Sequence, residues 1–247
     1  MLKGFWKLTW VETKVFVREP MGFVGSILMP VVIFVAFGRA FGAGPSAMTT
    51  TLDLPFNVAI LAALVIAVGS VQSLIAIISI YREGGILKRL RATPLSPVTI
   101  LGAQVVVKLA LTVVSLTLLV LAGRRLFPGV MQVNVLSFGA ALLLSTLSIL
   151  SLGFVLASLV LTARFAQLIG AVVMYPMLAL SGLFFPVERL PRVLQVVAFG
   201  LPTTHAVSLM QGVWNGSGWG AHWGDAVALV LLFAAFTGLS TRVFRWE

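Results

Sequence analysis

The chain has no cysteine among its 247 residues, which excludes disulfides, thiolate metal ligands and a cysteine nucleophile. It is also poor in charge. Charged residues make up 10% of the sequence, whereas soluble domains carry about 25%. Hydrophobic residues make up 60%, and the mean hydropathy is +1.09. A water-soluble fold could not bury so much apolar surface, so the composition indicates a membrane protein.

Several functional motifs are absent as well. No G-x-x-x-x-G-K-[ST] occurs, so the chain has no P-loop for ATP. No G-x-S-x-G is present, which weighs against a membrane hydrolase. The two histidines, His205 and His222, stand apart in the sequence without acidic neighbours at ligand spacing, and we expect no metal site. The net charge of +10 comes from cations in short loops beside apolar stretches, so we expect no nucleic-acid partner.

Six apolar stretches are long enough to cross a bilayer, which takes about 20 residues. The sequence therefore predicts an all-α membrane protein with six transmembrane helices. All seven acidic residues lie outside these stretches or at their ends, whereas a proton-coupled carrier usually needs an acid within a span. The predicted spans cover residues 21–41, 54–81, 98–122, 133–161, 167–185 and 223–244.

The cations between the predicted spans are distributed unequally, and this sets the expected orientation. The positive-inside rule places the richer side in the cytoplasm, with both termini. The Arg124–Arg125 pair is the main exception. The long charged region before residue 21 also argues against a cleaved signal peptide. One side has Lys3, Lys7, Lys14, Arg18, Arg82, Lys88, Arg89, Arg91, Arg164, Arg242 and Arg245; the other has Arg39, Arg124, Arg125, Arg189 and Arg192.

Residues 1–20 predict an amphipathic helix that lies in the membrane interface. Pro20 ends it, because the residue before a proline disfavours the helical conformation. The helix is either a topology anchor alone or also part of a docking surface for a cytoplasmic partner. Its cations Lys3, Lys7, Lys14 and Arg18 fall in one stripe, and Leu2, Phe5, Trp6, Phe16 and Val17 fall opposite.

Two interrupted segments lie between spans. In residues 82–97, Gly84-Gly85 interrupts the second apolar stretch and Thr93-Pro94 ends a short basic helix at the membrane surface. This segment is a solvated loop or a docking helix. In residues 186–212, two apolar stretches, 193–200 and 203–212, are each too short to span and are split at Leu201-Pro202. They form an interfacial loop or a hairpin that enters the outer leaflet.

Polar residues within the predicted spans have two interpretations each. Lys108 is a snorkelling lysine that faces the dimer or a cytoplasmic cavity, or it contacts a substrate headgroup. Gln72 is an interhelical hydrogen-bonding residue or lines the substrate path, and Gln104 and Gln167 are similar. Small residues along the fourth span predict a face for close helix packing. They are Ser145, Ser148, Ser151, Gly153, Ala157 and Ser158.

Both interrupted segments resemble the ABC-2 family of transporter permeases. The family pattern E-R-E-x-G-T-L-E-x-L-x-x-T-P is matched by Arg82, Glu83, Gly85, Leu87, Leu90, Thr93 and Pro94. Tyr81, Ile86 and Lys88 depart from it, and Lys88 reverses a charge. A second pattern, S-G-x-x-F-P-x-x-x-x-P, is matched by Ser181, Gly182, Phe185, Pro186 and Pro191, and the later Leu201-Pro202 matches the family's turn.

The resemblance implies a permease subunit of an ABC exporter in the bacterial cytoplasmic (inner) membrane. Its partners would be two copies of an ABC ATPase subunit, which bind ATP and Mg, and a second permease, identical or similar. The chain itself would hold no cofactor and would be no enzyme. The cargo of the similar drug and lipo-oligosaccharide exporters is amphiphilic. The alternatives are a channel or ion-gradient-driven carrier and, third, a structural membrane anchor.

The resemblance also assigns roles to residues. The coupling helix that contacts the ATPase would be the 82–97 segment, and residues 186–212 would form an external re-entrant hairpin. The coupling residues would be Arg82, Glu83, Gly85, Leu87, Lys88, Leu90, Arg91, Thr93 and Pro94, and the hairpin residues Phe185, Pro186, Glu188, Pro191 and Pro202. The interface helix contributes Trp6, Lys7, Lys14 and Arg18, and the possible substrate path contains Lys108 and Gln72.

Overall fold

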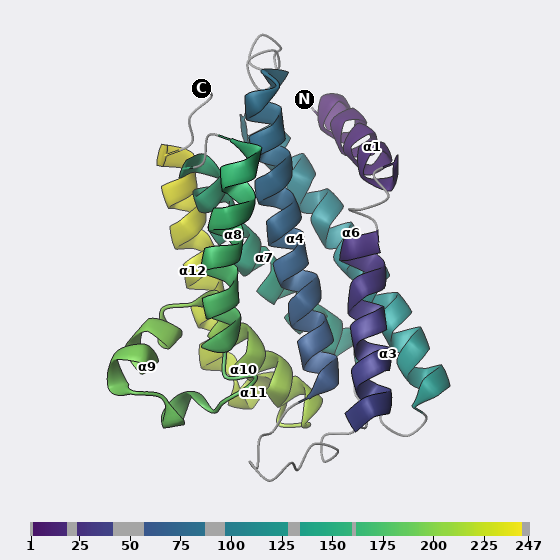
Figure 1. Ribbon diagram of the computed structural model, residues 1–247, viewed down its shortest axis with the longest axis vertical. Coiled ribbons are helices and arrows are strands. Elements are labelled where there is room, and N and C mark those ends of the chain that lie inside the picture. The colour runs from purple at the N-terminus through teal and green to yellow at the C-terminus, as the bar shows by residue number, and fades with distance from the viewer. Residues whose placement is uncertain are drawn as a thin grey trace.

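The structure is a computed structural model that describes residues 2–18, 24–41, 57–86, 97–127, 134–159 and 162–243. Every regular element in this part of the chain is helical, as the sequence predicts (Figure 1). The elements are α1 (Leu2–Arg18), the π-helical turn η1 (Val24–Leu28), α3 (Met29–Phe41), α4 (Val58–Glu83), α6 (Pro97–Leu126), α7 (Val135–Leu159), α8 (Ala163–Ala179), the 3₁₀ turn η2 (Val187–Arg189), α9 (Arg192–Phe199), α10 (Pro202–Trp214), α11 (Gly218–Ala221) and α12 (Trp223–Val243).

Four of these helices, α4, α6, α7 and α12, are long and apolar enough to cross a membrane, and the bent pair α9 and α10 would make a fifth as one broken span. Two of the six predicted spans correspond to shorter apolar helices, 24–40 and 164–179. Residues 21–23 of the predicted first span lie outside the described residues. The structure therefore establishes a multi-helix apolar bundle, and six full spans stay a prediction.

The predicted fifth span, 167–185, is displaced relative to the observed helix α8. Thr162 caps the N-terminus of α8, because its side chain accepts a hydrogen bond from the Phe165 amide. The helix ends at Ala179. Ser181 Oγ donates to the Leu178 carbonyl at 2.6 Å, and Gly182 has a left-handed φ of +85°, which suits glycine. The apolar residues after Ala179 therefore form a turn and not a continued helix.

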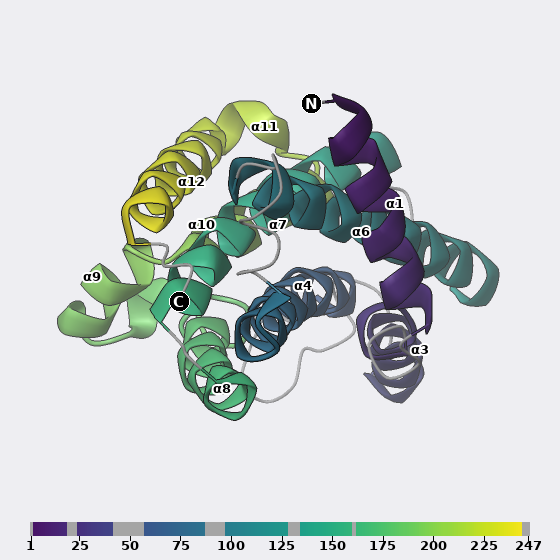
Figure 2. The same cartoon turned by 90° about the horizontal axis from the view of Figure 1, so that it is seen from above.

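Helices α4 and α7 form the centre of the bundle, and α3, α6, α8 and α12 surround them (Figure 2). In both central helices 72% of the apolar segment is buried, compared with 11% in α12. Small residues allow this close packing. A Cβ on Gly153 would lie 2.9 Å from Val71 Cγ1 on α4. All six of the small residues predicted to form a packing face on α7 are buried.

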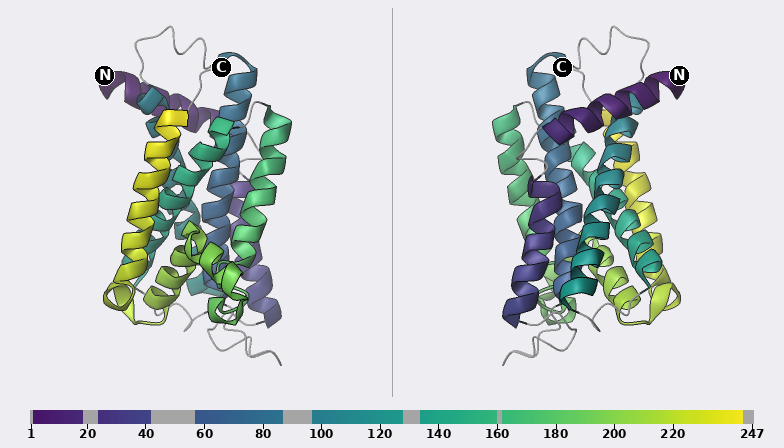
Figure 3. Two further views of the ribbon diagram at one scale, coloured as in Figure 1. Left: turned by 90° about the vertical axis from the view of Figure 1, so that its left-hand side faces the viewer. Right: turned by 90° about the vertical axis from the view of Figure 1, so that its right-hand side faces the viewer.

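The two ends of the bundle differ. Helix α1 lies across the end at which α4 and α12 terminate, at a steep angle to the other helices (Figure 3). Helices α9, α10 and α11 gather at the opposite end (Figure 1). The N-terminal helix and the end of α12 therefore share one end, in agreement with the expectation that the termini lie on the same side. Which side this is stays a prediction from the loop charges.

Candidate functional site

Helix α1 is attached to the bundle by one stripe of side chains. Thr9, Glu12 and Phe16 are buried, and they lie on one face because residues three and four apart share a face of a helix. The Phe16 ring lies 4.8 Å from Lys108 Nζ on α6. The sequence places Phe16 on the apolar face of a helix in the membrane interface, whereas in the structure this side chain is buried between α1 and α6.

The rest of α1 fits a helix in the membrane interface. Lys7, Lys14 and Arg18 are exposed. Trp6 is 61% exposed, and Trp10 is exposed to a similar extent. Lys14 Nζ lies 5.3 Å from the Trp10 ring centre. Cations and tryptophans together on the outer face are typical of helices at the headgroup level.

A hydrogen bond joins α1 to the end of α4. The Tyr81 hydroxyl donates to the Glu12 carboxylate, and its oxygen lies 2.8 Å from Oε1 and 2.7 Å from Oε2. Glu12 is only 3% exposed. Tyr81 occupies the position at which the family pattern has glutamate, and in this chain it binds a carboxylate that belongs to α1. The contact fixes α1 beside the first residues of the predicted coupling segment.

The first residues of that segment end α4. Arg82 is buried, and its Nη1 donates to the Ala157 carbonyl on α7 at 3.0 Å. The Gly85 amide donates to the Arg82 carbonyl, and Gly85 has a φ of +67°. Glycine in this conformation is the common residue just after a helix. Glu83, in contrast, is exposed. The remaining predicted coupling residues, Leu87, Lys88, Leu90, Arg91, Thr93 and Pro94, lie outside the described residues.

Lys108 and Gln72 lie between helices. Lys108 is 1% exposed, and its Nζ donates to Ser73 Oγ on α4 at 2.5 Å. It therefore lies inside the chain and does not face an open cavity in this structure. The Gln72 amide packs against Gly170 of α8, where a Cβ would overlap it. These contacts favour the packing interpretation of Gln72, and a place in the substrate path stays a prediction for both residues.

Three prolines begin elements at the opposite end of the bundle. Pro186 precedes η2, Pro191 precedes α9, and Pro202 is the first residue of α10. Proline suits these places, because its amide nitrogen has no hydrogen to leave unpaired in a first turn. Helices α9 and α10 meet at 80°. The predicted break at Leu201-Pro202 is therefore present, while entry of these helices into a leaflet stays a prediction.

The two helices of this pair differ in burial. Most of α10 is buried in the bundle, and Pro202 is among its buried residues. Helix α9 exposes Val193, Val196 and Val197 on one face. Phe185 is also exposed. Apolar side chains on this end of the molecule thus lack a cover within the described part of the chain, which is compatible with contact to lipid or to a second subunit.

A polar cluster connects α10 to the start of α12. His205 Nδ1 lies 2.8 Å from Asp225 Oδ1, and Ser208 Oγ donates to Asp225 Oδ2 at 2.7 Å. His222 Nδ1 lies 3.2 Å from Asp225 Oδ2. The expectation that the histidines are apart and lack an acidic neighbour is wrong. The fold brings them onto one carboxylate, although the described residues hold no group of three such side chains arranged for a metal.

His205 faces acceptors with both ring nitrogens, because its Nε2 lies 2.9 Å from the Phe199 carbonyl oxygen. Two acceptors favour the imidazolium, in which both nitrogens donate. The hydrogen bond to Asp225 is the largest cause that raises the pKa of His205 above its ordinary value, and the Phe199 carbonyl adds to it, against an opposing effect of burial. His205 lies in the first turn of α10, at the end of the bundle where α9, α10 and α11 gather (Figure 1).

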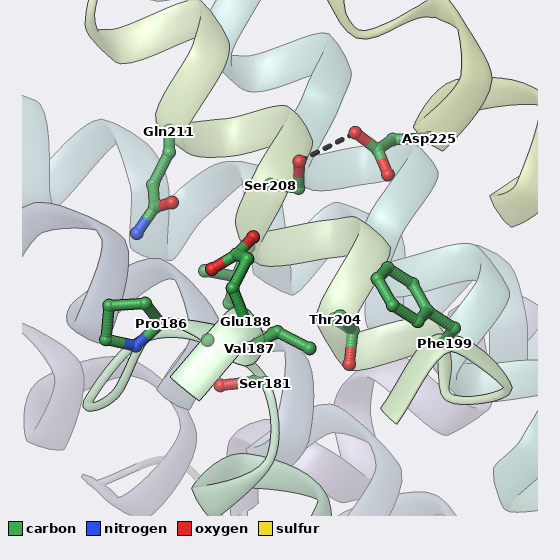
Figure 4. A pocket seen from close by; sticks show the side chains of 11 residues that line it. Ser181, Pro186, Val187, Glu188, Phe199, Thr204, Ser208, Gln211 and Asp225 are labelled. Carbon is green, nitrogen blue, oxygen red and sulfur yellow. Dashed lines mark hydrogen bonds between the residues drawn. The ribbon is translucent and has the colours of Figure 1, made fainter. Parts of the chain in front are cut away.

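The cluster borders a cavity of about 180 Å³ between the 181–188 turn and α10. Figure 4 shows Ser208 and Asp225 on one side of it, with Phe199, Thr204 and Glu188 around the remainder. The last turn of α8 is tied to α10 as well, because Thr203 Oγ1 donates to the Met177 carbonyl. The sequence analysis missed Asp225, Ser208 and Thr203. Only the spacing of His222 and Asp225, three residues apart at a helix start, signals part of this cluster.

The chain matches a known family over most of its length. The model of the family described as ABC-2 type transporter matches residues 3–214. The chain belongs to the ABC-2 type transporter family. The match covers nearly all of α1, residues 82–97 and residues 186–212, so both resemblances identified in the sequence fall within it.

Two curated relatives are similar to part of the chain. Both are inner membrane transport permeases named YhhJ, one from Escherichia coli strain K12 and one from Shigella flexneri. Each is 28% identical over 166 residues, which are 66% of this chain and 44% of the relative. The matched region thus spans less than half of the relatives' length. Family membership and the apolar helices together identify a multi-pass membrane protein.

Proposed function

We propose that this chain is the permease subunit of an ATP-driven exporter in the bacterial cytoplasmic membrane, with both termini in the cytoplasm. Two copies of a separate ABC ATPase would supply the energy, and a second permease would complete the pathway for an amphiphilic cargo. The observation that carries the proposal is the end of α4. There the family pattern begins, Glu83 is exposed, and Gly85 turns the chain out of the helix beside the docked α1.

The packing of α4 suggests how the signal travels. Helix α4 runs from Glu83 at one end of the bundle to the hairpin end, and it packs against α7, α8 and α10. Helix α8 leads directly into the turn before the hairpin. A push on residues 82–97 by closing ATPases would therefore move α4 as a rigid element and displace α10, which lies under the cavity at the other end.

The proposal is tested on the complex purified through a tag on this chain. Glu83→Ala and Gly85→Pro should leave membrane insertion and yield unchanged and lower ATP hydrolysis by the complex at least tenfold. Proline cannot adopt the positive φ of Gly85. Arg242→Ala is the matched control, because Arg242 is exposed at the same end of the bundle but lies outside the family pattern. Normal hydrolysis in both variants would show that the segment is only a loop.

A gradient-driven carrier is the second candidate, and one observation favours it. Asp225 lies in the first turn of α12 and binds two histidines, an arrangement able to take up a proton. The two candidates differ in their energy source. Export by the proposed permease stops when ATP is depleted and the ion gradient is kept, whereas a carrier continues.

A further inference from the structure

An apolar groove lies between α6 and α7 in the half of the bundle nearest the hairpin. Its volume is about 550 Å³. Gly139 and Ala140 form part of its floor, and Leu121 and the 85% exposed Leu136 stand beside them. Thr117 is the one polar side chain in its lining, and its hydroxyl donates to the Val113 carbonyl of its own helix. The walls therefore present hydrocarbon alone to an occupant.

An arginine follows the groove-lining residues of α6 along the same side of the helix. Helix α6 continues to Leu126, and Arg124 is exposed. Arg124 follows Leu121 by three residues and Thr117 by seven, so at 100° per residue it lies on the groove side of α6. It is about 10 Å beyond Thr117 along the helix axis. Arg125 is rotated by a further 100° and leaves that side.

The groove contributes no acidic side chain that could pair with the positive charge of Arg124. The sequence has no Asp or Glu between Glu83 and Glu188, so α6, α7 and the segment that connects them have no carboxylate. Arg124 forms no ion pair within the described part of the chain. In the predicted orientation this end of the bundle faces outwards, where the positive-inside rule depletes cations, so an arginine pair here needs a reason beyond topology.

We propose that an anionic phospholipid, from the leaflet at the hairpin end, binds with one acyl chain in this groove and its phosphate on Arg124. A guanidinium matches phosphate geometry through two parallel N–H bonds. Lipid tails are as apolar as the groove, so burial of the chain alone gives little preference over bulk lipid. The phosphate contact supplies the selectivity, and the groove fixes where the lipid lies. This inference does not depend on the energy source of transport.

The test uses the purified full-length chain in detergent, titrated with dioleoyl phosphatidylglycerol or dioleoyl phosphatidylcholine and followed by native mass spectrometry. The wild type should bind the anionic lipid more tightly than the zwitterionic one. Arg124→Gln should weaken phosphatidylglycerol binding at least tenfold, which corresponds to about 1.4 kcal/mol, because a charged hydrogen bond is lost. Arg39→Gln is the matched control, because Arg39 is also exposed near the end of its helix.

A second pair of variants tests the groove itself. Ala140→Trp fills the groove without changing charge and should also weaken phosphatidylglycerol binding. Ala235→Trp, at an exposed alanine on α12, should leave it unchanged. If Arg124→Gln and Arg39→Gln reduce binding equally, or if Ala140→Trp has no effect, the proposal is wrong. It is equally wrong if Ala140→Trp lowers the fraction of dimer and not lipid binding, because the groove is then a contact between copies of the chain.

Discussion

The hydrogen bond between Tyr81 and Glu12 should hold the interface helix to the bundle. Tyr81→Phe removes the hydroxyl and changes little else. It leaves the Glu12 carboxylate, which is 3% exposed, without a donor at 2.7–2.8 Å. Glu12→Gln keeps the shape of the side chain and removes its charge. The two variants and their combination make a double-mutant cycle.

The expected size follows from the chemistry of the pair. A hydrogen bond to a charged group contributes about 1.5–3 kcal/mol, and a buried acceptor left unpaired costs about 1–3 kcal/mol. We expect Tyr81→Phe to lower the free energy of unfolding by about 2 kcal/mol. In the Glu12→Gln background the same change should cost less than about 1 kcal/mol, because the acceptor is then neutral.

The assay is unfolding of the purified chain in mixed micelles by added sodium dodecyl sulfate, followed by fluorescence of its six tryptophans. Tyr175→Phe is the matched control, because Tyr175 is the second of two tyrosines and is 66% exposed on α8. Equal losses for the two tyrosine variants would refute the reasoning. So would a coupling energy below about 0.5 kcal/mol, which is within ordinary additivity.

Three further predictions concern the bundle and the hairpin. Gly153→Ala should lower the unfolding free energy by about 1–3 kcal/mol, because the added Cβ would lie 2.9 Å from Val71 Cγ1. The control Gly69→Ala should be neutral or stabilising in the same unfolding assay, because the space around its Cβ is open. Ser73→Ala should cost about 1–3 kcal/mol by removing a hydrogen bond from the buried Lys108 ammonium, and Lys108→Met should cancel this cost when the two changes are combined. The raised pKa of His205 predicts a contribution to stability that is complete below the unfolded value of about 6.5 and is lost as pH rises through the folded pKa. The thermal midpoint of the wild type should therefore fall with rising pH across this window more than that of His205→Gln, and parallel pH profiles would contradict it.

Local signals predicted several features correctly. The end of α4 was predicted from Gly84-Gly85, and the structure ends this helix at Glu83 with Gly85 at positive φ. The break at Leu201-Pro202 separates α9 from α10 as expected. These features depend on the conformational limits of glycine and proline, which act within a few residues.

Features that depend on distant partners could not be predicted. Apolar character continues past Ala179, so hydropathy alone extended the fifth span to residue 185, whereas Ser181 and Gly182 turn the chain there. The pattern of α1 alone placed Phe16 opposite the cations of this helix and could not show that α6 covers it. The cluster on Asp225 joins three residues from α10 and the segment around α12, and apart from the spacing of His222 and Asp225 no sequence pattern signals these contacts.

The central claim is that the end of α4 faces a cytoplasmic ATPase subunit. Since the chain has no cysteine, Glu83→Cys and Arg189→Cys each place a single thiol at an exposed charged position, at one of the two opposite ends of the bundle. The account predicts that position 83 forms a cross-link to a P-loop ATPase that co-purifies with the chain and is protected in intact cells from a membrane-impermeant thiol reagent, while position 189 is labelled and forms no such cross-link. Labelling of position 83 from outside, or a cross-link from position 189 and not from 83, would contradict it.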